Sequence, residues 1–557
     1  MSLQFITGNS GNGKTKYLFN RIVKEAKANP RDNYLVIVPE QFTMQTQRQL
    51  VDLSENKAIM NIDVLSFKRL AYRVFDELGI TNLTVLEETG KNLVLRKLAA
   101  QEADKLGVIG RNLNRIGYIS EVKSLLSELV QYNISPEELG RYISSGRLSD
   151  TLSDKLKDVL VLYEAFEKFM QDKYITAEEI LNVLSNVAEE SAILRNSVIA
   201  FDEFTGFTPI QNQLIKKLFV ISKKIYVTLT IDCREDIFKS RGMQELFDMP
   251  KRTVKSLTEM AAFYGIEVEE PIILDKNYRL AENEELSFME QQLFRKRRCS
   301  FKKAPKHIHI DCLRDPKQEL TKIARRINEL VRNENLRYRD IAIVTGDVNI
   351  YAGYVREIFD KYNIPYFIDA TQEILFHPFI EFIRSIPDIA AQNFSADAVF
   401  RFLRCGFSEL LDSEIDVLEN YVLACGVRGK SEWDKKWVRL PKHKAGYDLE
   451  LLNQSREYIM ELLKPVYQVF SDKKSTVKDY VLAIYKLIVL LDIPDKLAKK
   501  EQALLDAGDQ TASKEYGQIY KIVMQLFEKY VAVLGDECMD TEEFTQILDA
   551  GLDAADV

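Results

Sequence analysis

The chain has 557 residues, of which 46% are hydrophobic and 29% are charged, and its formal net charge is −8. This length exceeds what one hydrophobic core supports, so we expect about three or four domains. The composition excludes a disordered or fibrous protein. The acidic balance excludes a uniformly basic protein that coats nucleic acid, although a motor can hold a strand in a locally basic groove.

Neither a membrane span nor a secretion signal is visible. No apolar run approaches the roughly 20 residues that cross a bilayer. Met1–Phe5 carries no basic segment followed by an apolar stretch. The six cysteines are scattered, with no Cys-x-x-Cys pair and no zinc-type spacing. We therefore expect a cytoplasmic protein with no membrane partner and no metal cluster within these residues.

Strand-like and helical segments alternate at the start of the chain. β-branched residues and period-2 runs indicate the strands, and apolar residues three and four apart indicate the helices. The strands are expected at Leu3–Thr7, Tyr34–Pro39 and Ile59–Val64, and the helices at Lys16–Ala28, Gln45–Leu53 and Phe67–Leu78. Such alternation predicts a parallel sheet with helices on both faces.

From about residue 86 to residue 191 the pattern is continuously that of amphipathic helices. Strand-like segments then return at Ser197–Glu203 and Ile225–Asp232. The simplest interpretation is one α/β domain formed by residues 1–85 and 192–290, interrupted by a helical insertion at 86–191.

A basic linker, Phe294–Lys303, precedes a second α/β region at residues 300–375. Its strands are expected at His307–Leu313, Asp340–Thr345 and Pro365–Asp369. Residues 376–557 are helical again. The predicted order is therefore an α/β domain with a helical insertion, a second α/β domain and a helical tail.

The segment Gly8–Thr15 matches the phosphate-loop pattern G-x-x-x-x-G-K-S/T and lies between a predicted strand and a predicted helix. Backbone N–H groups of such a loop surround phosphates, and the helix directs its positive end at them. We predict that Lys14 reaches the β- and γ-phosphates and that the Thr15 hydroxyl binds Mg²⁺. The predicted nucleotide-binding residues are Gly8, Asn9, Ser10, Gly11, Asn12, Gly13, Lys14 and Thr15. The alternative is a chance glycine turn before a helix.

Two adjacent carboxylates, Asp202 and Glu203, follow the apolar run Val198–Phe201. A phosphate-loop site needs an acid at the end of another strand to hold the metal and polarise water. We predict that Asp202 holds Mg²⁺ through its water shell and that Glu203 is the general base, which makes Lys14, Asp202 and Glu203 the catalytic set. The alternative is an acidic pair at a strand end that faces solvent.

Six segments of the chain are individually distinctive: Met1–Gly8, Val38–Thr43, Val64–Leu70, Phe204–Pro209, Tyr366–Asp369 and His377–Pro378. In this order along the whole chain, they resemble the B subunit of AddAB-type helicase–nucleases. The resemblance implies an α/β fold with two RecA-like P-loop NTPase cores of the superfamily 1 helicase type, each with a large helical insertion. The cores would be residues 1–85 with 192–290, and 300–375; the helical regions would be 86–191 and 376–557.

The resemblance also implies a function. By this resemblance, the chain would be an ATP-binding, Mg-dependent subunit of a heterodimeric DNA helicase–exonuclease. Together with an A subunit it would process double-stranded DNA ends for recombinational repair. The B subunit would read a single-stranded recombination hotspot sequence. By analogy Thr43, Ser66, Phe67 and Arg69 would lie on the DNA path, with Phe67 stacking on a base and Arg69 contacting a phosphate. The alternative for Phe67 is the first core position of its helix.

Two positions depart from the family pattern. Gly346 and Asp347 stand where family members carry a basic residue, and Asp232–Arg234 lacks the glutamine that motor helicases use to couple hydrolysis to DNA. The nuclease domain and the cysteine ligands of an iron–sulfur (4Fe-4S) cluster, both implied by the resemblance, would lie beyond Val557. We therefore expect the front part of a longer subunit, inactive alone as helicase or nuclease.

These observations leave three hypotheses. The first is an ATPase subunit that helps to drive unwinding and resection, favoured by Lys14, Thr15, Asp202 and Glu203. The second is a nucleotide-binding scaffold that recognises DNA without motor activity, favoured by the altered coupling segment. The third is a P-loop kinase, which two α/β units with large helical insertions disfavour.

Overall fold

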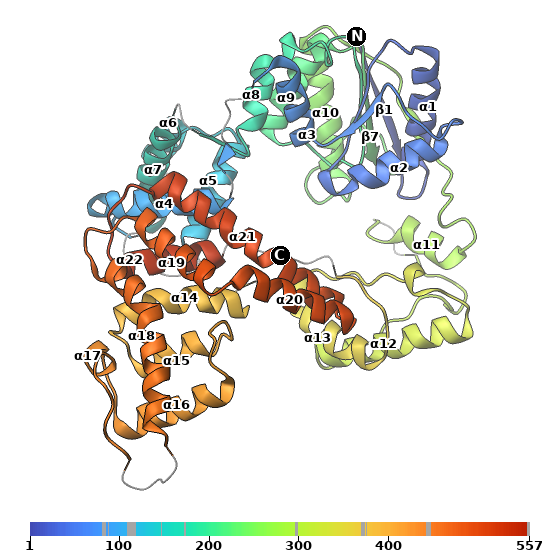
Figure 1. The fold of residues 1–557 in the computed structure, drawn as a ribbon. Helices are drawn as coiled ribbons and strands as arrows, with labels where there is room; N and C mark the ends of the chain where they lie inside the picture. Colours follow the sequence, from blue (N-terminus) through green and yellow to red (C-terminus); the bar gives the residue numbers. More distant parts are fainter. Residues whose placement is uncertain are drawn as a thin grey trace. The chain divides into compact units, whose positions relative to one another are not determined.

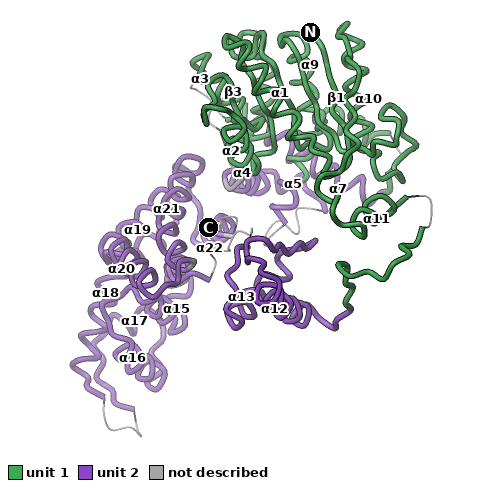
Figure 2. Tube along the Cα trace, turned by 90° about the vertical axis from the view of Figure 1, so that its right-hand side faces the viewer, with its two compact units in different colours: residues 1–86, 124–149, 167–311 green, residues 87–123, 150–166, 312–557 purple. Residues whose placement is uncertain are grey.

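The structure is a computed structural model (Figure 1), and it describes residues 1–80, 85–86, 88–108, 118–145, 148–171, 174–295, 299–368, 374, 376–441 and 447–553. The chain divides into two compact units, which Figure 2 shows in different colours. Unit 1 contains residues 1–86, 124–149 and 167–311; unit 2 contains residues 87–123, 150–166 and 312–557. Within the described ranges, no helix has both the length and the apolar character that a membrane span requires.

Unit 1 is built on a parallel sheet of seven strands, in the order β3-β2-β6-β7-β1-β8, with β9 also paired to β1. The strands are β1 (Ser2–Gly8), β2 (Tyr34–Ile37), β3 (Ile62–Leu65), β6 (Val198–Phe201), β7 (Lys224–Thr230), β8 (Glu267–Val268) and β9 (Ile272–Leu274). Gly8 is opposite Thr230 and Phe201 is opposite Val227. The carboxyl ends of β1, β6 and β7 therefore meet at one edge of the sheet. The parallel sheet predicted for the first α/β region is confirmed.

Helices cover both faces of this sheet, as Figure 1 shows. Successive residues of a strand point to opposite faces. Leu35 and Ile37 therefore join the core beneath α3 (Phe67–Leu78), α9 (Pro209–Ile221) and α10 (Asp248–Phe263), whereas Tyr34 and Val36 join the core beneath α1 and α2. The two helices of the second face are α1 (Lys14–Ala28) and α2 (Thr43–Leu53). Burial on both faces explains why the strands read as continuous apolar runs.

Helices also dominate the span predicted as an insertion. The elements are α4 (Glu88–Gln101), α5 (Tyr118–Gln131), α6 (Pro136–Ser144), α7 (Asp150–Met170) and α8 (Ile180–Val187), with the short pair β4 (Val85–Leu86) and β5 (Ile175–Thr176). α6 and α8 belong to unit 1, whereas α4 belongs to unit 2. There the Arg96 guanidinium donates to the Gln546 carbonyl at 3.0 Å. These helices are therefore shared between the two units.

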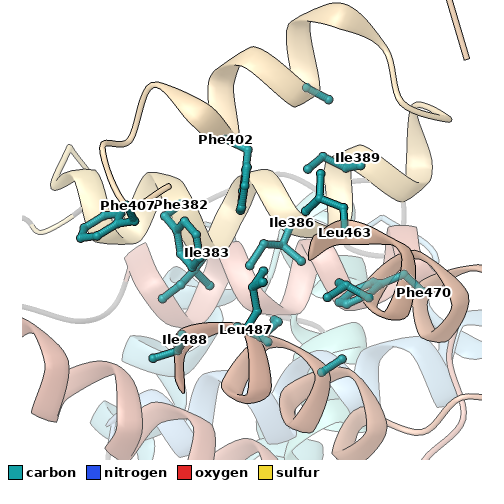
Figure 3. Close-up of a cluster of buried hydrophobic side chains, with 14 of the residues drawn as sticks. Phe382, Ile383, Ile386, Ile389, Phe402, Phe407, Leu463, Phe470, Leu487 and Ile488 are labelled. Carbon is teal, nitrogen blue, oxygen red and sulfur yellow. The ribbon is translucent and has the colours of Figure 1, made fainter. Parts of the chain in front are cut away.

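Unit 2 is helical in its described residues. After α12 (Pro316–Asn333) and α13 (Val348–Lys361), its helices are α14 (Pro378–Ala391), α15 (Ala396–Leu403), α16 (Asp412–Cys425), α17 (Lys430–Trp433), α18 (Leu449–Ser471), α19 (Val477–Leu490), α20 (Ile493–Asp506), α21 (Gln510–Leu534) and α22 (Thr541–Asp553). Figure 3 shows part of their common core, in which Ile386 of α14 lies near Leu463 of α18 and Leu487 of α19, and Phe382 of α14 packs against Phe402 and Phe407.

The second sheet predicted at residues 300–375 is not formed in the described residues, so the two RecA-like cores expected from the sequence are not confirmed. α12 and α13 pack against each other, but the three predicted strand segments form no ladder, and Asp369 and residues 296–298 of the basic linker lie outside the described residues. Ile310 is 94% exposed and Val344 is 92% exposed. A β-branched pattern marks a segment that suits a sheet, but a strand also needs a neighbouring backbone to accept its hydrogen bonds.

Candidate nucleotide-binding site

The phosphate loop connects the carboxyl end of β1 to the first turn of α1. Gly11 has φ 88° and Gly13 has φ 79°. Both values lie in the left-handed region, which glycine adopts without the strain of a side chain. The loop opens into a cleft of about 850 Å³ in unit 1. The predicted strand–loop–helix arrangement around Gly8–Thr15 is thus present, with α1 beginning at Lys14.

Lys14 and Thr15 line this cleft from the loop side. The Lys14 ammonium donates to the Asn9 carbonyl at 3.1 Å. Burial lowers the pKa of Lys14 from its usual value, and the nearby carboxylates of Glu203 and Asp202 oppose this shift. The Thr15 hydroxyl donates to Glu203 Oε1 at 3.2 Å. The two side chains that the sequence assigned to phosphate and metal therefore face the predicted acidic pair.

Asp202 reaches the same cleft from the end of β6 and is 1% exposed. The register of β6 against β7 places Thr228 across from it, and the Thr228 hydroxyl donates to Asp202 Oδ1. The second oxygen, Oδ2, is buried and has no partner with good hydrogen-bond geometry among the described residues, although the Thr15 hydroxyl is a further donor beside this carboxyl. Burial raises the pKa of this carboxyl, and the hydrogen bond from Thr228 opposes the rise.

The oxygen atoms at this position fit Mg²⁺. A buried carboxylate oxygen without a donor is costly unless a cation or ordered water satisfies it. Mg²⁺ prefers hard oxygen ligands and usually keeps several waters of its own. Asp202 Oδ2 and the Thr15 hydroxyl supply such oxygens within one cleft. The residues therefore suit the divalent cation that the sequence predicts.

Glu203 lies at the exposed mouth of the cleft, and its backbone is unusual. Its φ of 64° is in the left-handed region. A non-glycine residue held there stores on the order of 1 kcal/mol or more, and such residues gather at functional sites. This conformation turns the carboxylate toward the Thr15 hydroxyl rather than along the strand. The sequence did not predict this backbone, because strand patterns do not report the residue after the strand.

A segment that the sequence reading missed closes the other side of the loop. The Asn277 amide donates to the Ser10 carbonyl at 3.0 Å, and Tyr278 N–H donates to the Gly11 carbonyl at 3.0 Å. The Arg279 guanidinium lies 3.4 Å from Ser10 Oγ, and Tyr278 and Arg279 line the cleft. The sequence contained one indication of this segment. The short apolar run of β9 is followed by polar residues, which are expected at the same sheet edge as the phosphate loop.

Comparison with known proteins bears on this same region. The family model described as "ADDB, N-terminal" matches residues 5–290, a span that holds the phosphate loop, the acidic pair and Asn277–Arg279. The chain belongs to this family. The resemblance noted in the sequence is therefore confirmed.

Relatives of this ADDB-family chain have informative names. The B subunit of the ATP-dependent helicase/deoxyribonuclease of Lachnoclostridium phytofermentans is 38% identical over 567 aligned positions, which cover 100% of this chain and 49% of the relative. The proteins of the same name from Clostridium acetobutylicum and Clostridioides difficile are 32% and 31% identical, over 99% of this chain and 48% and 49% of the relatives. The chain thus spans about half the length of the curated relatives it matches.

The candidate DNA-binding residues of the ADDB-family chain divide into buried and exposed positions. Thr43 and Ser66 are 3% and 5% exposed, and the Ser66 hydroxyl caps α3 by accepting the N–H of Arg69 at 3.3 Å. Phe67 is 7% exposed and stacks on Phe201 at 5.8 Å between ring centroids. The structure therefore favours core packing for Phe67 over base stacking. The Arg69 side chain is half-exposed, 4.0 Å from Glu40.

The segment Asp232–Arg234 of the ADDB-family chain contains no glutamine and holds a buried carboxylate that pairs with two arginines. Asp232 is 1% exposed and bonds to Arg234 at 2.6 Å and to Arg295 at 2.8 Å. Burial alone would raise the pKa of Asp232, but the hydrogen bonds and charge of Arg234 lower it to about 2. Gly346, the other departure, lies in unit 2 and is not part of this cleft.

Proposed function

We propose that these residues form the ATP-binding part of the B subunit of an ATP-dependent helicase–deoxyribonuclease that processes double-stranded DNA ends for recombinational repair. The observation that carries this proposal is the convergence of Lys14, Thr15, Asp202 and Glu203 on one cleft. ATP hydrolysis requires a positive charge beside the phosphates, ligands for a metal ion and a general base. Lys14 would supply the charge, Thr15 and Asp202 the metal ligands, and Glu203 the base. The names of the relatives support the assignment of this chemistry to DNA unwinding and cleavage.

The roles of the residues in hydrolysis follow from their positions. The loop N–H groups and the amino end of α1 bind the phosphates, and Lys14 neutralises the charge on the β- and γ-oxygens. When Mg²⁺ is bound through Thr15 and Asp202, it adds electrophilic stabilisation of the same oxygens. Glu203 accepts the proton of the water that attacks the terminal phosphorus, as the bond from this phosphorus to the ADP oxygen breaks.

Arg279 and Tyr278 extend this assignment to the opposite wall of the cleft. Arg279 brings a guanidinium, which suits bidentate binding of phosphate oxygens, next to Ser10. Tyr278 offers a ring on which the nucleotide base can stack. We propose that Arg279 stabilises charge on the terminal phosphate, in the role of an arginine supplied by the same chain.

The rest of the proposal concerns the complex. The partner would be an A subunit. The substrates would be double-stranded DNA ends and the single strands that unwinding produces. The complex would recognise a hotspot sequence in the single strand. Because bacterial DNA is cytoplasmic, we propose the same location for this protein. A second RecA-like core, a nuclease domain and a 4Fe-4S cluster would belong to the whole subunit. We expect residues 1–557 alone neither to unwind nor to degrade DNA.

One observation favours a second candidate, a nucleotide-binding scaffold that recognises DNA without motor activity. Asp232, in the segment that lacks the glutamine that motor helicases use for coupling, is paired with Arg234 and Arg295. Breaking a buried pair of this kind is costly, so its side chain is poorly suited to follow each cycle of hydrolysis.

The rate of ATP turnover by the assembled complex separates the two candidates. Turnover is measured with and without single-stranded DNA, for the heterodimer that contains the wild-type site and for the heterodimer with Lys14→Ala. If this site drives the motor, the variant loses the DNA-stimulated turnover that this site contributes and unwinds ends more slowly. If the site belongs to a scaffold, the variant leaves stimulated turnover unchanged but alters the nucleotide dependence of DNA binding. Equal behaviour of both complexes in both assays contradicts a nucleotide role.

A further inference from the structure

Asn9, the second residue of the phosphate loop, is held at both ends of its side-chain amide. It is 6% exposed. Its Oδ1 accepts the backbone N–H of Cys233 at 3.1 Å, and its Nδ2 donates to Glu290 Oε1 at 2.7 Å. Rotation of the amide would break both hydrogen bonds and leave buried polar atoms unpaired. The side chain therefore has one orientation.

The main chain of Asn9 connects this fixed side chain to the rest of the loop. Its carbonyl accepts the N–H of Asn12 at 3.2 Å and the ammonium of Lys14 at 3.1 Å. The loop thus closes on the residue that Glu290 and Cys233 hold. A displacement of Asn9 would shift both the backbone turn and the resting position of the Lys14 side chain.

The helix that carries Glu290 is anchored by contacts that do not involve the loop. α11 (Glu284–Gln292) ends beside β7, where the Arg234 guanidinium donates to the Gln291 carbonyl at 3.1 Å. Just after the helix, Arg295 bonds to Asp232 at 2.8 Å, and its guanidinium lies over the Phe247 ring at 4.9 Å. These contacts present the Glu290 carboxylate to the loop from a fixed support.

We propose that Glu290 is a positioning residue for nucleotide binding, which acts through Asn9 to hold the phosphate loop in its receptive shape. This proposal rests on the proposed nucleotide-binding function. A loop with three glycines has many accessible conformations, and fixing it on binding costs conformational entropy. A hydrogen bond from a charged acceptor that fixes the loop beforehand removes part of that cost and raises affinity. Without it, the same contacts to phosphate form from a less ordered loop.

The same helix also holds the segment that leads out of unit 1. The Glu285 carboxylate accepts the N–H groups of Lys306 and His307 at 2.7 and 2.8 Å. Unit 1 ends four residues later, at Asp311. One face of α11 therefore contacts the phosphate loop, and another contacts the departing chain.

The first test measures the dissociation constant of a fluorescent Mg·ATP analogue for the 557-residue chain. Glu290→Ala removes the acceptor and should weaken binding about tenfold, as expected for loss of one hydrogen bond to a charged group. Glu290→Gln keeps an oxygen acceptor and should weaken binding less. The matched control is Glu284→Ala on the same helix, whose exposed carboxylate contacts Lys303; its affinity should equal that of the wild type.

A polarity swap distinguishes the specific pair from general support by the helix. Asn9→Asp places a carboxylate against Glu290 and should weaken binding more than Glu290→Ala, because two like charges repel at this distance. Combining Asn9→Asp with Glu290→Gln restores a hydrogen bond in the opposite direction, in which the new side chain at position 290 donates and the one at position 9 accepts. The Cys233 N–H keeps its acceptor at position 9. The double variant should recover part of the affinity that Asn9→Asp loses. A purely structural role for α11 predicts no recovery.

Amide hydrogen exchange in nucleotide-free protein keeps this proposal separate from the proposed function. Glu290→Ala should accelerate exchange at the amides of Ser10–Gly13 while the global unfolding midpoint stays at the wild-type value. If the wild type binds no nucleotide, the proposed function fails, and the exchange result alone decides the positioning role. Wild-type exchange and wild-type affinity in Glu290→Ala, or a double variant no better than Asn9→Asp, would overturn the positioning role. A fall in the unfolding midpoint that accounts for the whole loss of affinity would also overturn it.

Discussion

A methyl group added at Gly11 would meet the segment that closes the phosphate loop. Its position would be 2.8 Å from Asn277 Oδ1 and 2.8 Å from Arg279 Cβ, and the φ of Gly11 is +88°. An L-residue in the left-handed region costs about 1–2 kcal/mol, and an overpacked contact costs about 1–3 kcal/mol. The free loop of Gly11→Ala relieves this strain by leaving its phosphate-binding shape, and binding must restore that shape at a cost of about 3 kcal/mol. We therefore expect Gly11→Ala to weaken Mg·ATP binding roughly a hundredfold.

The matched control for this variant is Gly79→Ala. Gly79, after α3, has φ +68° but no atom within 4 Å of an added methyl group. Its substitution should therefore cost about 1 kcal/mol of stability from backbone strain and leave nucleotide affinity unchanged. Titration with a fluorescent ATP analogue gives the affinities, and urea unfolding gives the stabilities. Wild-type affinity in Gly11→Ala would refute the placement of Asn277–Arg279 against the loop.

Three further predictions test other parts of the account. Glu203→Gln should keep nucleotide binding but lower ATP turnover about 10²–10⁴-fold, as expected for loss of a general base. Single-turnover hydrolysis measures this rate, and an unchanged rate would show that another residue is the general base. Phe67→Ala should destabilise unit 1 by about 3–5 kcal/mol in urea unfolding. Arg69→Ala should leave stability unchanged but weaken binding of single-stranded DNA and flatten the salt dependence of that binding. An unaltered salt dependence in Arg69→Ala would place the DNA path elsewhere. Because Arg234 lowers the pKa of Asp232 to about 2, below the unfolded value, this carboxylate stabilises the fold above about pH 4 and loses that contribution as the pH falls toward 2. The stability difference between wild type and Asp232→Asn should shrink over that range, and a pH-independent difference would contradict it.

The site was predictable where its signals are local in the sequence. An apolar run, a glycine turn and a helix follow one another within Leu3–Ala28, and the acidic pair follows directly on Val198–Phe201. The rule that parallel strands end at one edge of a sheet then brings Lys14 and Asp202 together. These inferences need only short-range patterns and one topological rule. That is why the strand–loop–helix prediction and the placement of the acidic pair agree with the structure.

The parts that were missed depend on long-range packing. Asn277 contacts Ser10 across 267 residues, and no periodicity reports such a pairing. Phe67 is compatible with core or surface until Phe201 is placed beside it. The strand-like segment around Val344 has the residue preferences of a sheet, but whether backbone partners are present is not encoded in the segment itself. The sequence also does not predict the hydrogen bond between Glu290 and Asn9, because the spacing of apolar residues in a helix does not indicate which polar side chains form pairs.

The most direct measurement of the central claim is the equilibrium binding of Mg·ATP to the 557-residue chain and to its Lys14→Ala variant, by isothermal titration calorimetry. We expect one site per chain in the wild type and a binding isotherm too weak to fit in the variant. We also expect the same far-ultraviolet circular dichroism and unfolding midpoint for both proteins, because the Lys14 side chain lines the cleft and its ammonium donates to the Asn9 carbonyl rather than packing in a core. Equal affinity of the two proteins, or no binding by a folded wild type, would contradict the assignment of this cleft as a nucleotide site.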